Sequence, residues 1–311
     1  MKYINHTLTF KIEEPTVITF GKFDGLHRGH ELLMKTLFQK REESGYKTVV
    51  FTFDIPPRNK VNEMEAKVLT TNAEKLHIFE REGVDYLLEC PFTPEVMRME
   101  PEEFLKWVIT SLNVKCIVTG DDFHFGCQRK GDHILIEQMA EQLGYEACIF
   151  PKVQENNRDI SSTYIREEIA KGNLEKANHL LGYEFLIKGE VVHGNALGRT
   201  MGMPTINLAT PKEKLLPPNG VYVSRVEIQG RFYRGVSNVG RKPTIEGENP
   251  VLVETYIFDW DKELYGEEVV VSLLHYLRPE KKFTGVEELS KQMKKDLQNT
   301  IKYYEDITKM C

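Results

Sequence analysis

The stretch VITFGKFDGLHRGH, residues 17–30, begins as an apolar strand and ends with two histidines three positions apart. The amphipathic run ELLMKTLFQKREESG, residues 31–45, follows at once, and its apolar side chains recur at helical spacing. A buried strand that passes into a helix through a glycine-rich turn is typical of a βαβ unit. This stretch therefore predicts that the amino-terminal half of the chain folds around a parallel sheet.

The same alternation of strand and helix patterns continues through the first half of the chain. Apolar runs follow at residues 47–53, 84–89, 115–120 and 146–150, and amphipathic stretches lie between them at 72–83 and 101–113. Because crossovers between parallel strands are right-handed, this alternation predicts a doubly wound, Rossmann-like α/β domain with helices on both faces of the sheet.

The pattern changes in the second half of the chain. Two short helices are predicted within residues 161–182, and β-branched and aromatic residues follow in alternating runs separated by turns such as Gln229-Gly230. These runs predict an antiparallel barrel or sandwich, which an amphipathic helix at residues 285–307 follows. The domain boundary is therefore expected near Tyr183, which gives domains 1–182 and 183–311.

The composition is that of an ordinary globular protein, with 41% hydrophobic and 28% charged residues. The net charge of −6 argues against a protein that coats nucleic acid. The sequence contains no run of 18 apolar residues, so no membrane-spanning helix is predicted. The first twenty residues include acidic ones and do not resemble a signal peptide. The five cysteines are scattered without C-x-x-C spacing, which favours reduced thiols in a cytoplasmic protein.

The turn after the first apolar run has the chemistry of a phosphate site. The free N–H groups and the dipole of a new helix favour anions, and Gly21, Gly25 and Gly29 let the backbone approach a ligand closely. His27 and His30 point the same way on a first helical turn, so two imidazoles can stabilise charge during phosphoryl or nucleotidyl transfer. The glycine patterns of the P-loop and of the dinucleotide-binding turn are both absent.

The histidine pair resembles the H-x-G-H motif of a nucleotidyltransferase superfamily, in which two histidines stabilise the α-phosphate while pyrophosphate leaves. The superfamily's second motif, I-S-S-T-x-x-R, is matched by ISSTYIRE, residues 160–167. The resemblance implies that His27 and His30 are catalytic and that Arg166 holds a β- or γ-phosphate. It also implies ATP or phosphate binding by Gly21, Phe23, Asp24, Gly25, Ser161, Ser162 and Thr163.

A third motif narrows this resemblance. It is TGDDFHFGCQRKGD, residues 119–132, which is similar to the G-x-[ND]-F-x-F-G segment of prokaryotic-type FAD synthetases. The similarity implies that Asp122 lies near the nucleotide and metal and that Phe123 and Phe125 wall the flavin, although core packing is an equal alternative for both rings. Pro56 departs from the family, which tends to carry histidine at that position of the flavin-side loop.

The second half carries another cluster of motif residues, GEVVHGNALGRTMGMPTINL, residues 189–208. A glycine-rich loop ahead of a strand suits ATP phosphates, and Thr205 and Asn207 share a face of that strand and offer oxygen ligands to Mg²⁺. The cluster resembles the riboflavin kinase signature G-x-x-x-G-R-x-[LM]-G-[FM]-P-T-[AI]-N. This resemblance implies a magnesium site at Thr205 and Asn207, and ATP binding by Gly189, Gly198, Arg199 and Pro204.

Three downstream segments match the same kinase family: LVETYIFDW (252–260), NVGRKPT (238–244) and LRPEKKF (277–283). The match implies that Glu254 is the base that accepts the proton of a primary alcohol, and that Arg278 faces the flavin. Met203 and Lys242 depart from the usual phenylalanine and arginine.

Taken together, the motifs resemble the bifunctional bacterial riboflavin kinase/FAD synthetase family over nearly the whole chain. The resemblance implies a Greek-key β-barrel in the second domain, with ATP and Mg²⁺ used to make FMN and then FAD. Riboflavin, FMN and ATP are the expected partners, without nucleic acid or membrane, for a monomer or weak homo-oligomer. The alternatives are a flavin-binding regulatory paralogue, a kinase with an impaired first domain, and a nucleotidyltransferase for another phosphate ester.

Overall fold

The computed structural model describes residues 1–54, 67–194, 198, 202–241 and 251–310. Among the motif residues singled out above, Pro56, Arg199 and Lys242 lie outside the described residues. By its contacts the chain divides into two compact units, Met1–Ala66 with Lys75–Ser162, and Lys67–Glu74 with Thr163–Cys311. Within the described ranges, no helix combines the length and apolar composition that crossing a membrane requires.

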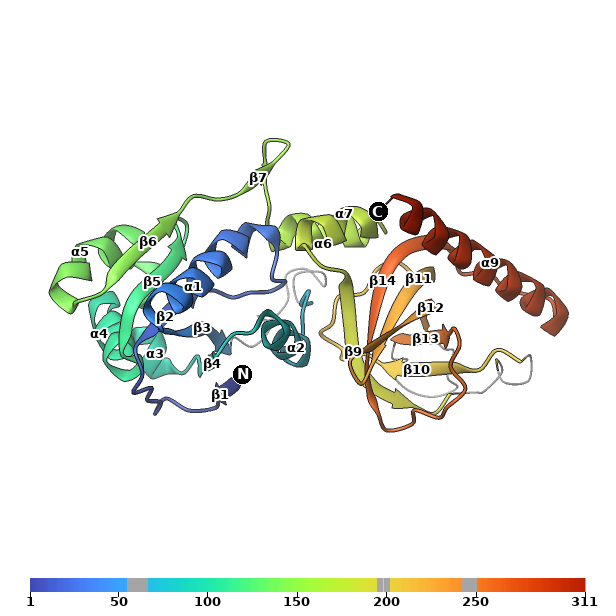
Figure 1. Ribbon diagram of the computed structural model, residues 1–311, viewed down its shortest axis with the longest axis horizontal. Coiled ribbons are helices and arrows are strands. Elements are labelled where there is room, and N and C mark those ends of the chain that lie inside the picture. Colours follow the sequence, from blue (N-terminus) through green and yellow to red (C-terminus); the bar gives the residue numbers. More distant parts are fainter. Residues whose placement is uncertain (55–66, 195–197, 199–201, 242–250, 311) are drawn as a thin grey trace. The chain divides into compact units, whose positions relative to one another are not determined.

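The first unit is built on a six-stranded parallel sheet (Figure 1). Its strands are β1 (Lys2–Asn5), β2 (Thr16–Phe20), β3 (Lys47–Asp54), β4 (Tyr86–Pro91), β5 (Val114–Gly120) and β6 (Glu146–Phe150). Across the sheet they follow the order β1-β4-β3-β2-β5-β6. The winding direction therefore changes between β2 and β5, as it does in doubly wound folds.

Helices cover both faces of this sheet, which confirms the predicted α/β architecture. They are α1 (Glu31–Ser44), α2 (Asn72–Glu82), α3 (Pro94–Arg98), α4 (Pro101–Leu112) and α5 (His133–Leu143). Because successive strand residues point to opposite faces, Val17 of β2 packs in one cluster with Leu33 of α1. The next residue, Ile18, packs in the opposite cluster with Phe104 of α4 and Ile136 of α5. A small hairpin of β7 (Gln154–Glu155) and β8 (Arg158–Asp159) follows β6.

One strand of the sheet begins later than its apolar pattern predicts. The run at residues 84–89 suggests a strand from Val84, but β4 begins at Tyr86. The backbone N–H of Val84 instead donates to the carbonyl of Phe79 at the end of α2, at 3.1 Å. The buried Val84 side chain therefore belongs to the helix end rather than to the strand.

The second unit contains a closed antiparallel barrel. Its strands are β9 (Phe185–Val192), β10 (Thr205–Ala209), β11 (Gly220–Ile228), β12 (Arg231–Arg241), β13 (Val251–Ile257) and β14 (Glu268–Pro279). Around the barrel the order is β10-β13-β12-β11-β14-β9, and β9 pairs back with β10. Since β14 returns to lie beside β11, the first strand of a three-strand meander, the connection is a Greek key. Closure confirms the barrel and excludes the sandwich.

Short-range sequence signals explain how the barrel strands are joined. Gln229 and Gly230 both have positive φ, 49° and 77°, and form the predicted two-residue turn between β11 and β12. Among the described residues, the helices α6 (Ser162–Ala170), α7 (Leu174–Leu181) and the terminal α9 (Val286–Met310) belong to this unit, apart from Ser162 itself. Tyr304 of α9 donates its hydroxyl to the carbonyl of Ser224 at 2.8 Å, which fastens the helix to the barrel.

A buried ion pair brings an early segment of the chain into the second unit. The segment is Lys67–Glu74, whose last residues begin α2. The Lys214 ammonium lies 2.7 Å from a carboxylate oxygen of Glu74, and both side chains are 0% exposed. The same ammonium donates to the carbonyls of Leu69 and Leu186, at 2.6 and 2.8 Å. A charge buried this deeply is stable only when it is fully partnered.

Candidate functional site

The first candidate site is the turn between β2 and α1, at the carboxyl end of the parallel sheet. It lies where the winding direction changes, which is where open α/β sheets bind ligands. The chain bends sharply here because Phe23 and Gly25 both have positive φ, 46° and 78°. The buried Phe23 ring packs against Phe79 and lies 5.0 Å from the His30 ring, so it fastens the turn to the core.

The structure brings His27 and His30 together face to face. Their ring centroids are 3.9 Å apart, with an angle of 22° between the planes. The backbone N–H of His27 donates to Nδ1 of His30 at 3.3 Å, and the N–H of His30 donates to the carbonyl of His27 at 2.7 Å. These bonds close a 3-10 turn over Arg28–His30 and hold both imidazoles in one place.

The surroundings keep both imidazoles neutral at pH 7. Burial lowers the pKa of His27 to about 4, and the nearby carboxylates of Asp122 and Asp24 offset only part of this shift. Burial and the adjacent His27 also lower the pKa of His30 well below its usual value. An anion bound beside the rings would raise both pKa values. The pair can therefore donate hydrogen bonds to a phosphate without carrying a charge of its own.

The histidine turn and the I-S-S-T motif meet in the structure. Ser162 donates its hydroxyl to the carbonyl of Asp24 at 2.7 Å, although 138 positions separate the two residues. A Cβ on Gly29 would lie 2.8 Å from the His27 ring and 3.0 Å from the carbonyl of Ile160, so only glycine fits between the motifs. The two predicted phosphate-binding segments therefore form one backbone junction.

The other residues of the I-S-S-T motif are placed along the start of α6. Ser161 is half-buried, Thr163 is exposed, and the half-buried Arg166 follows Ser162 by one helical turn. The division between the units falls after Ser162, so Thr163 and Arg166 count with the second unit. Their positions are therefore described along the helix only.

The loop after β5 carries the predicted flavin residues. Asp122 extends toward solvent and forms an ion pair with Lys152 at 3.3 Å. Phe123 stacks between Phe20 and Phe125, with centroids 5.4 and 5.5 Å away and planes 13° apart in both cases. Phe125 is only 4% exposed and belongs to the hydrophobic core, whereas Phe123 is half-buried at its edge. Of the two rings, Phe123 is therefore the one with surface to offer a ligand.

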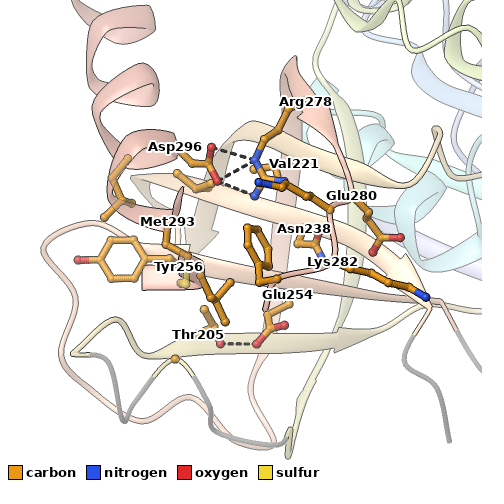
Figure 2. A pocket seen from close by; sticks show the side chains of 16 residues that line it. Thr205, Val221, Asn238, Glu254, Tyr256, Arg278, Glu280, Lys282, Met293 and Asp296 are labelled. Atoms are coloured by element: carbon orange, nitrogen blue, oxygen red, sulfur yellow. Dashed lines mark hydrogen bonds and ion pairs between the residues drawn. The ribbon is translucent and has the colours of Figure 1, made fainter. Parts of the chain in front are cut away.

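The second candidate site lies across three neighbouring barrel strands. Register places Asn207 of β10 opposite Glu254 of β13, and Glu254 opposite Asn238 of β12. Because these residues lie abreast, their side chains emerge on one face. Thr205, two residues before Asn207, donates its hydroxyl to Oε1 of Glu254 at 2.7 Å, and Figure 2 shows this bond at the edge of a pocket.

The pocket has a volume of about 600 Å³ and is lined by the barrel, by residues 278–283 and by α9. Glu254, Thr205 and Asn238 line it, and Asn207 is buried beside them. Apolar side chains provide much of the remaining wall, among them Tyr256 and the side chains Phe283, Leu289, Met293 and Leu297. A polar corner facing an apolar cavity suits a ligand with an aromatic body and a polar chain.

Arg278 lines the pocket, but its guanidinium is already engaged. Its Nε lies 3.0 and 3.1 Å from the two carboxylate oxygens of Asp296, and its Nη2 lies 2.7 Å from one of them. Gln292 donates to the same carboxylate at 2.9 Å, and Asp296 is 3% exposed (Figure 2 labels the arginine–aspartate pair). The pair joins the end of β14 to α9 in the pocket wall.

Two described glycines ahead of β10, Gly194 and Gly198, lie close to these oxygen donors. Gly198 lines the pocket, and a Cβ there would lie 2.3 Å from the carbonyl of Met203. A Cβ on Gly194 would lie 2.2 Å from the side-chain nitrogen of Asn207. Pro204 is exposed just before Thr205. Gly189, by contrast, lies within β9, where an added Cβ would lie 3.1 Å from the carbonyl oxygen of Ala209.

The donors at this site fit a hard divalent cation. Thr205, Asn207 and Glu254 offer hydroxyl, amide and carboxylate oxygens, and no softer ligand type is needed. Mg²⁺ binds through few protein oxygens and keeps coordination positions for phosphate and water. The three side chains named here would leave such positions available.

Sequence patterns did not identify all residues of the second site. Asn238 lies within the matched NVGRKPT segment, so its strand position abreast of Glu254 could have been inferred from the pairing of adjacent strands. Asp296 offers no such signal, because in the sequence it is one polar residue of an amphipathic helix. Its partner Arg278 lies 18 positions earlier, on a strand.

Comparisons with known proteins agree with this division into two sites. Residues 9–164 match the family model described as FAD synthetase, and residues 181–304 match the model described as riboflavin kinase. A bifunctional riboflavin kinase/FMN adenylyltransferase of Bacillus subtilis (strain 168) is 36% identical over 310 residues, covering 98% of this chain and 97% of the relative. The protein of that name from Escherichia coli (strain K12) is 34% identical over 296 residues, covering 94% and 93%.

A solved structure resembles the chain over a similar length. It is titled as a macrolide-efflux protein from Streptococcus pneumoniae, is 34% identical, and covers 94% of this chain and 95% of that one with a TM-score of 0.81. Its title names an activity that neither matching family model describes.

Proposed function

This chain belongs to the bifunctional riboflavin kinase/FMN adenylyltransferase family, and from that premise we propose which of its residues carry the two reactions. The kinase phosphorylates riboflavin with ATP to give FMN. The adenylyltransferase joins FMN to the AMP part of a second ATP, which gives FAD and releases pyrophosphate.

For the kinase, the proposed base is Glu254. Its carboxylate lies in the pocket wall and is oriented by the hydroxyl of Thr205, so one oxygen holds that bond while the other can accept the proton of the ribityl 5′-hydroxyl. Thr205 and Asn207 would hold Mg²⁺, which when bound neutralises phosphate charge. The apolar wall under α9 would take the flavin ring and exclude water from it, and Arg278 would lie at its edge.

For the adenylyltransferase, the proposed catalytic pair is His27 and His30. The two neutral imidazoles would donate hydrogen bonds to the α-phosphate and so stabilise the negative charge that develops there as the FMN phosphate attacks. The backbone junction around Asp24 and Ser162 would present N–H groups to the phosphates, and Arg166 would hold those that depart. Asp122 and Phe123 would lie on the flavin side of the site.

The observation that carries this proposal is the convergence of Thr205, Asn207 and Glu254 on one side of a pocket, together with the stacked histidines at the other site. The experiment supplies purified full-length protein with ATP, Mg²⁺ and either riboflavin or FMN, and follows the products by chromatography. His30→Ala should lower FAD formation roughly 10²–10³-fold and spare FMN formation. Glu254→Gln should lower FMN formation roughly 10²–10⁴-fold and spare FAD formation from added FMN.

Two matched variants serve as controls for this experiment. His6→Asn removes an exposed imidazole of the first unit outside the motifs, and Glu268→Gln removes an exposed glutamate at the start of β14; both should leave the two rates unchanged. If His30→Ala and Glu254→Gln each impaired both reactions equally while the protein stayed folded, the assignment of one reaction to each site would be wrong.

The setting of the enzyme is a further part of the proposal. We place it in the cytoplasm, where ATP and reduced thiols occur together, as a monomer or weak homo-oligomer. Sedimentation of the full chain over a range of concentrations tests the oligomeric state. Fractionation of cells that express it tests the compartment.

A further inference from the structure

Three metal-ligating side chains gather on the first unit's sheet, away from the proposed phosphate sites. Cys116 of β5 lies opposite Glu146 of β6, and Cys148 follows Glu146 by two residues, so all three emerge on one face. The Lys40 side chain of α1 reaches both oxygens of the Glu146 carboxylate, at 2.7 and 2.8 Å. Glu146 begins β6, whereas the histidine turn and the Asp122 loop follow the carboxyl ends of β2 and β5.

The distances within this group match a tetrahedral metal site. The two sulfurs are 3.8 Å apart, Cys148 Sγ lies 3.5 Å from Glu146 Oε1, and the three ligand atoms all lie within 4.8 Å of one another. Zinc–sulfur bonds of about 2.3 Å at a tetrahedral angle separate two sulfurs by about 3.8 Å. A zinc–oxygen bond of about 2.1 Å places a carboxylate oxygen about 3.6 Å from either sulfur. One ion could therefore contact all three atoms with little movement.

The charges of the group also favour one divalent cation. With both thiols protonated, the Glu146 carboxylate and the Lys40 ammonium cancel. A divalent ion that displaces the two thiol protons leaves two thiolates, one carboxylate, one ammonium and the ion, and the sum is again zero. The exchange therefore creates no net charge in a site whose Cys116 is 0% exposed. The Glu146 side chain is 53% exposed, which gives the ion a route from solvent.

We propose that Cys116, Cys148 and Glu146 form a binding site for a thiophilic divalent cation of the zinc class, with water in the fourth position. Two thiolates and one carboxylate are soft enough to prefer such an ion to Mg²⁺, so the cation used with ATP does not compete for the site. Lys40 is a positioning residue here, because its ammonium donates to both oxygens of the Glu146 carboxylate and so fixes its orientation. A bound ion would cross-link β5 to β6.

The test uses the full-length protein, reduced and freed of metal with a chelator, and titrates it with Cd²⁺ alone. We expect a sulfur-to-cadmium charge-transfer band in the ultraviolet that saturates at one ion per chain. Co²⁺ should give the intense visible bands of a tetrahedral thiolate site. Cys116→Ser and Cys148→Ser should each remove most of the charge-transfer intensity, and Glu146→Gln should weaken Cd²⁺ binding roughly tenfold or more.

Cys127→Ser is the matched control, because Cys127 is a half-buried thiol of the same unit that lies in the 3-10 turn Cys127–Arg129 and on neither β5 nor β6. It should bind Cd²⁺ as the unaltered chain does. FMN adenylylation by each serine variant shows that the unit is folded. The proposal is overturned if the band survives in the double variant Cys116→Ser/Cys148→Ser, or if reduced, folded protein gives no band. It is also overturned if mass spectrometry shows that the two thiols join as a disulfide under the titration conditions, which would make them a redox pair instead.

Discussion

Replacing Glu74 by glutamine should destabilise the riboflavin kinase unit, although Glu74 lies within the segment that matches the FAD synthetase family model. The reason is the ion pair between Glu74 and Lys214, because both side chains are 0% exposed. Glutamine keeps the size and shape of the side chain and removes the charge that faces the ammonium. The lysine would keep the carbonyl oxygens of Leu69 and Leu186 as partners but would lose the negative charge that compensates its own.

The magnitude follows from the contacts that Glu74 makes. Its two oxygens accept from Lys214 Nζ at 2.7 Å and from the backbone N–H groups of Thr71 and Lys188 at 2.8 and 3.1 Å. Removing one member of a buried ion pair costs about 3–5 kcal/mol, and we expect about 3 because one amide oxygen remains as an acceptor. For a unit of roughly 150–200 residues, that loss lowers the midpoint of thermal unfolding by roughly 6–12 °C.

The assay heats the full-length protein through a temperature series and then measures the two activities separately on each sample. Glu74→Gln should shift the loss of kinase activity to lower temperature and leave the loss of adenylyltransferase activity nearly in place. Glu80→Gln changes an exposed glutamate of the same helix and should shift neither curve. Adding Lys214→Met to Glu74→Gln should recover at least half of the loss, since no unpaired charge then remains buried.

Two results would refute this reasoning. If Glu74→Gln lowered the midpoint of the adenylyltransferase and left the kinase in place, the segment Lys67–Glu74 would belong energetically to the first unit. If the double variant were as unstable as Glu74→Gln or less stable, the unpaired ammonium would not be the cause.

Three further perturbations test other parts of the structure. Burial lowers the pKa of His27 to about 4, against 6.5 for an ordinary histidine, so the unfolded chain binds more protons than the folded chain between these pH values. The stability of the first unit should therefore be complete above about pH 6.5 and fall as the pH drops toward 4. His27→Gln should flatten this pH dependence, measured as the midpoint of urea unfolding at each pH. Gly194→Ala places a Cβ 2.2 Å from a proposed magnesium ligand and should lower FMN formation while raising its Mg²⁺ requirement, whereas Gly285→Ala, with open space around it, should change neither. Asp296→Asn loosens the guanidinium of Arg278 at the pocket and should raise the KM for riboflavin roughly tenfold with a smaller change in kcat, measured by steady-state kinetics.

Local patterns in the sequence predict most of the fold correctly, because the spacing of apolar residues follows from which face of each helix or strand is buried. The apolar runs of the first half are followed closely by β2, β3, β5 and β6, since parallel strands covered on both faces must be apolar throughout. The Gln229-Gly230 turn was predictable because a two-residue hairpin needs two residues of positive φ. The start of β4 was predicted two residues too early, because an apolar residue can be buried either at the end of a helix or in a strand. Val84 is buried at the end of α2.

Contacts between distant residues could not be predicted in this way. Cys116 and Cys148 are 32 positions apart, and their spacing along the chain carries no metal-site pattern; only the pairing of β5 with β6 brings their sulfurs together. The pair of Lys214 and Glu74 spans 140 positions, and each residue alone has the sequence context of a surface charge. Such pairs depend on strand order and tertiary packing, which no local period encodes.

The two proposed sites differ in the charge of the side chains that would lie near the ATP phosphates: neutral histidines at the first and a carboxylate at the second. This difference should make the two reactions depend differently on Mg²⁺. At the first site the histidines are neutral before ATP binds, so the two imidazoles meet the phosphates as hydrogen-bond donors, and the carboxylates of Asp24 and Asp122 lie near His27 without belonging to the pair. At the second site the proposed base Glu254 is itself an anion among oxygen donors, and its repulsion of a polyphosphate must be offset by a cation before the carboxylate can lie near the reacting groups. Kinase activity should therefore vanish steeply as Mg²⁺ is removed, while the dependence of FAD formation on Mg²⁺ should be shallower, measured as the two rates over a Mg²⁺ titration at fixed ATP. Equal steepness in the two titrations would mean that the neutral histidines do not reduce the first site's need for a cation.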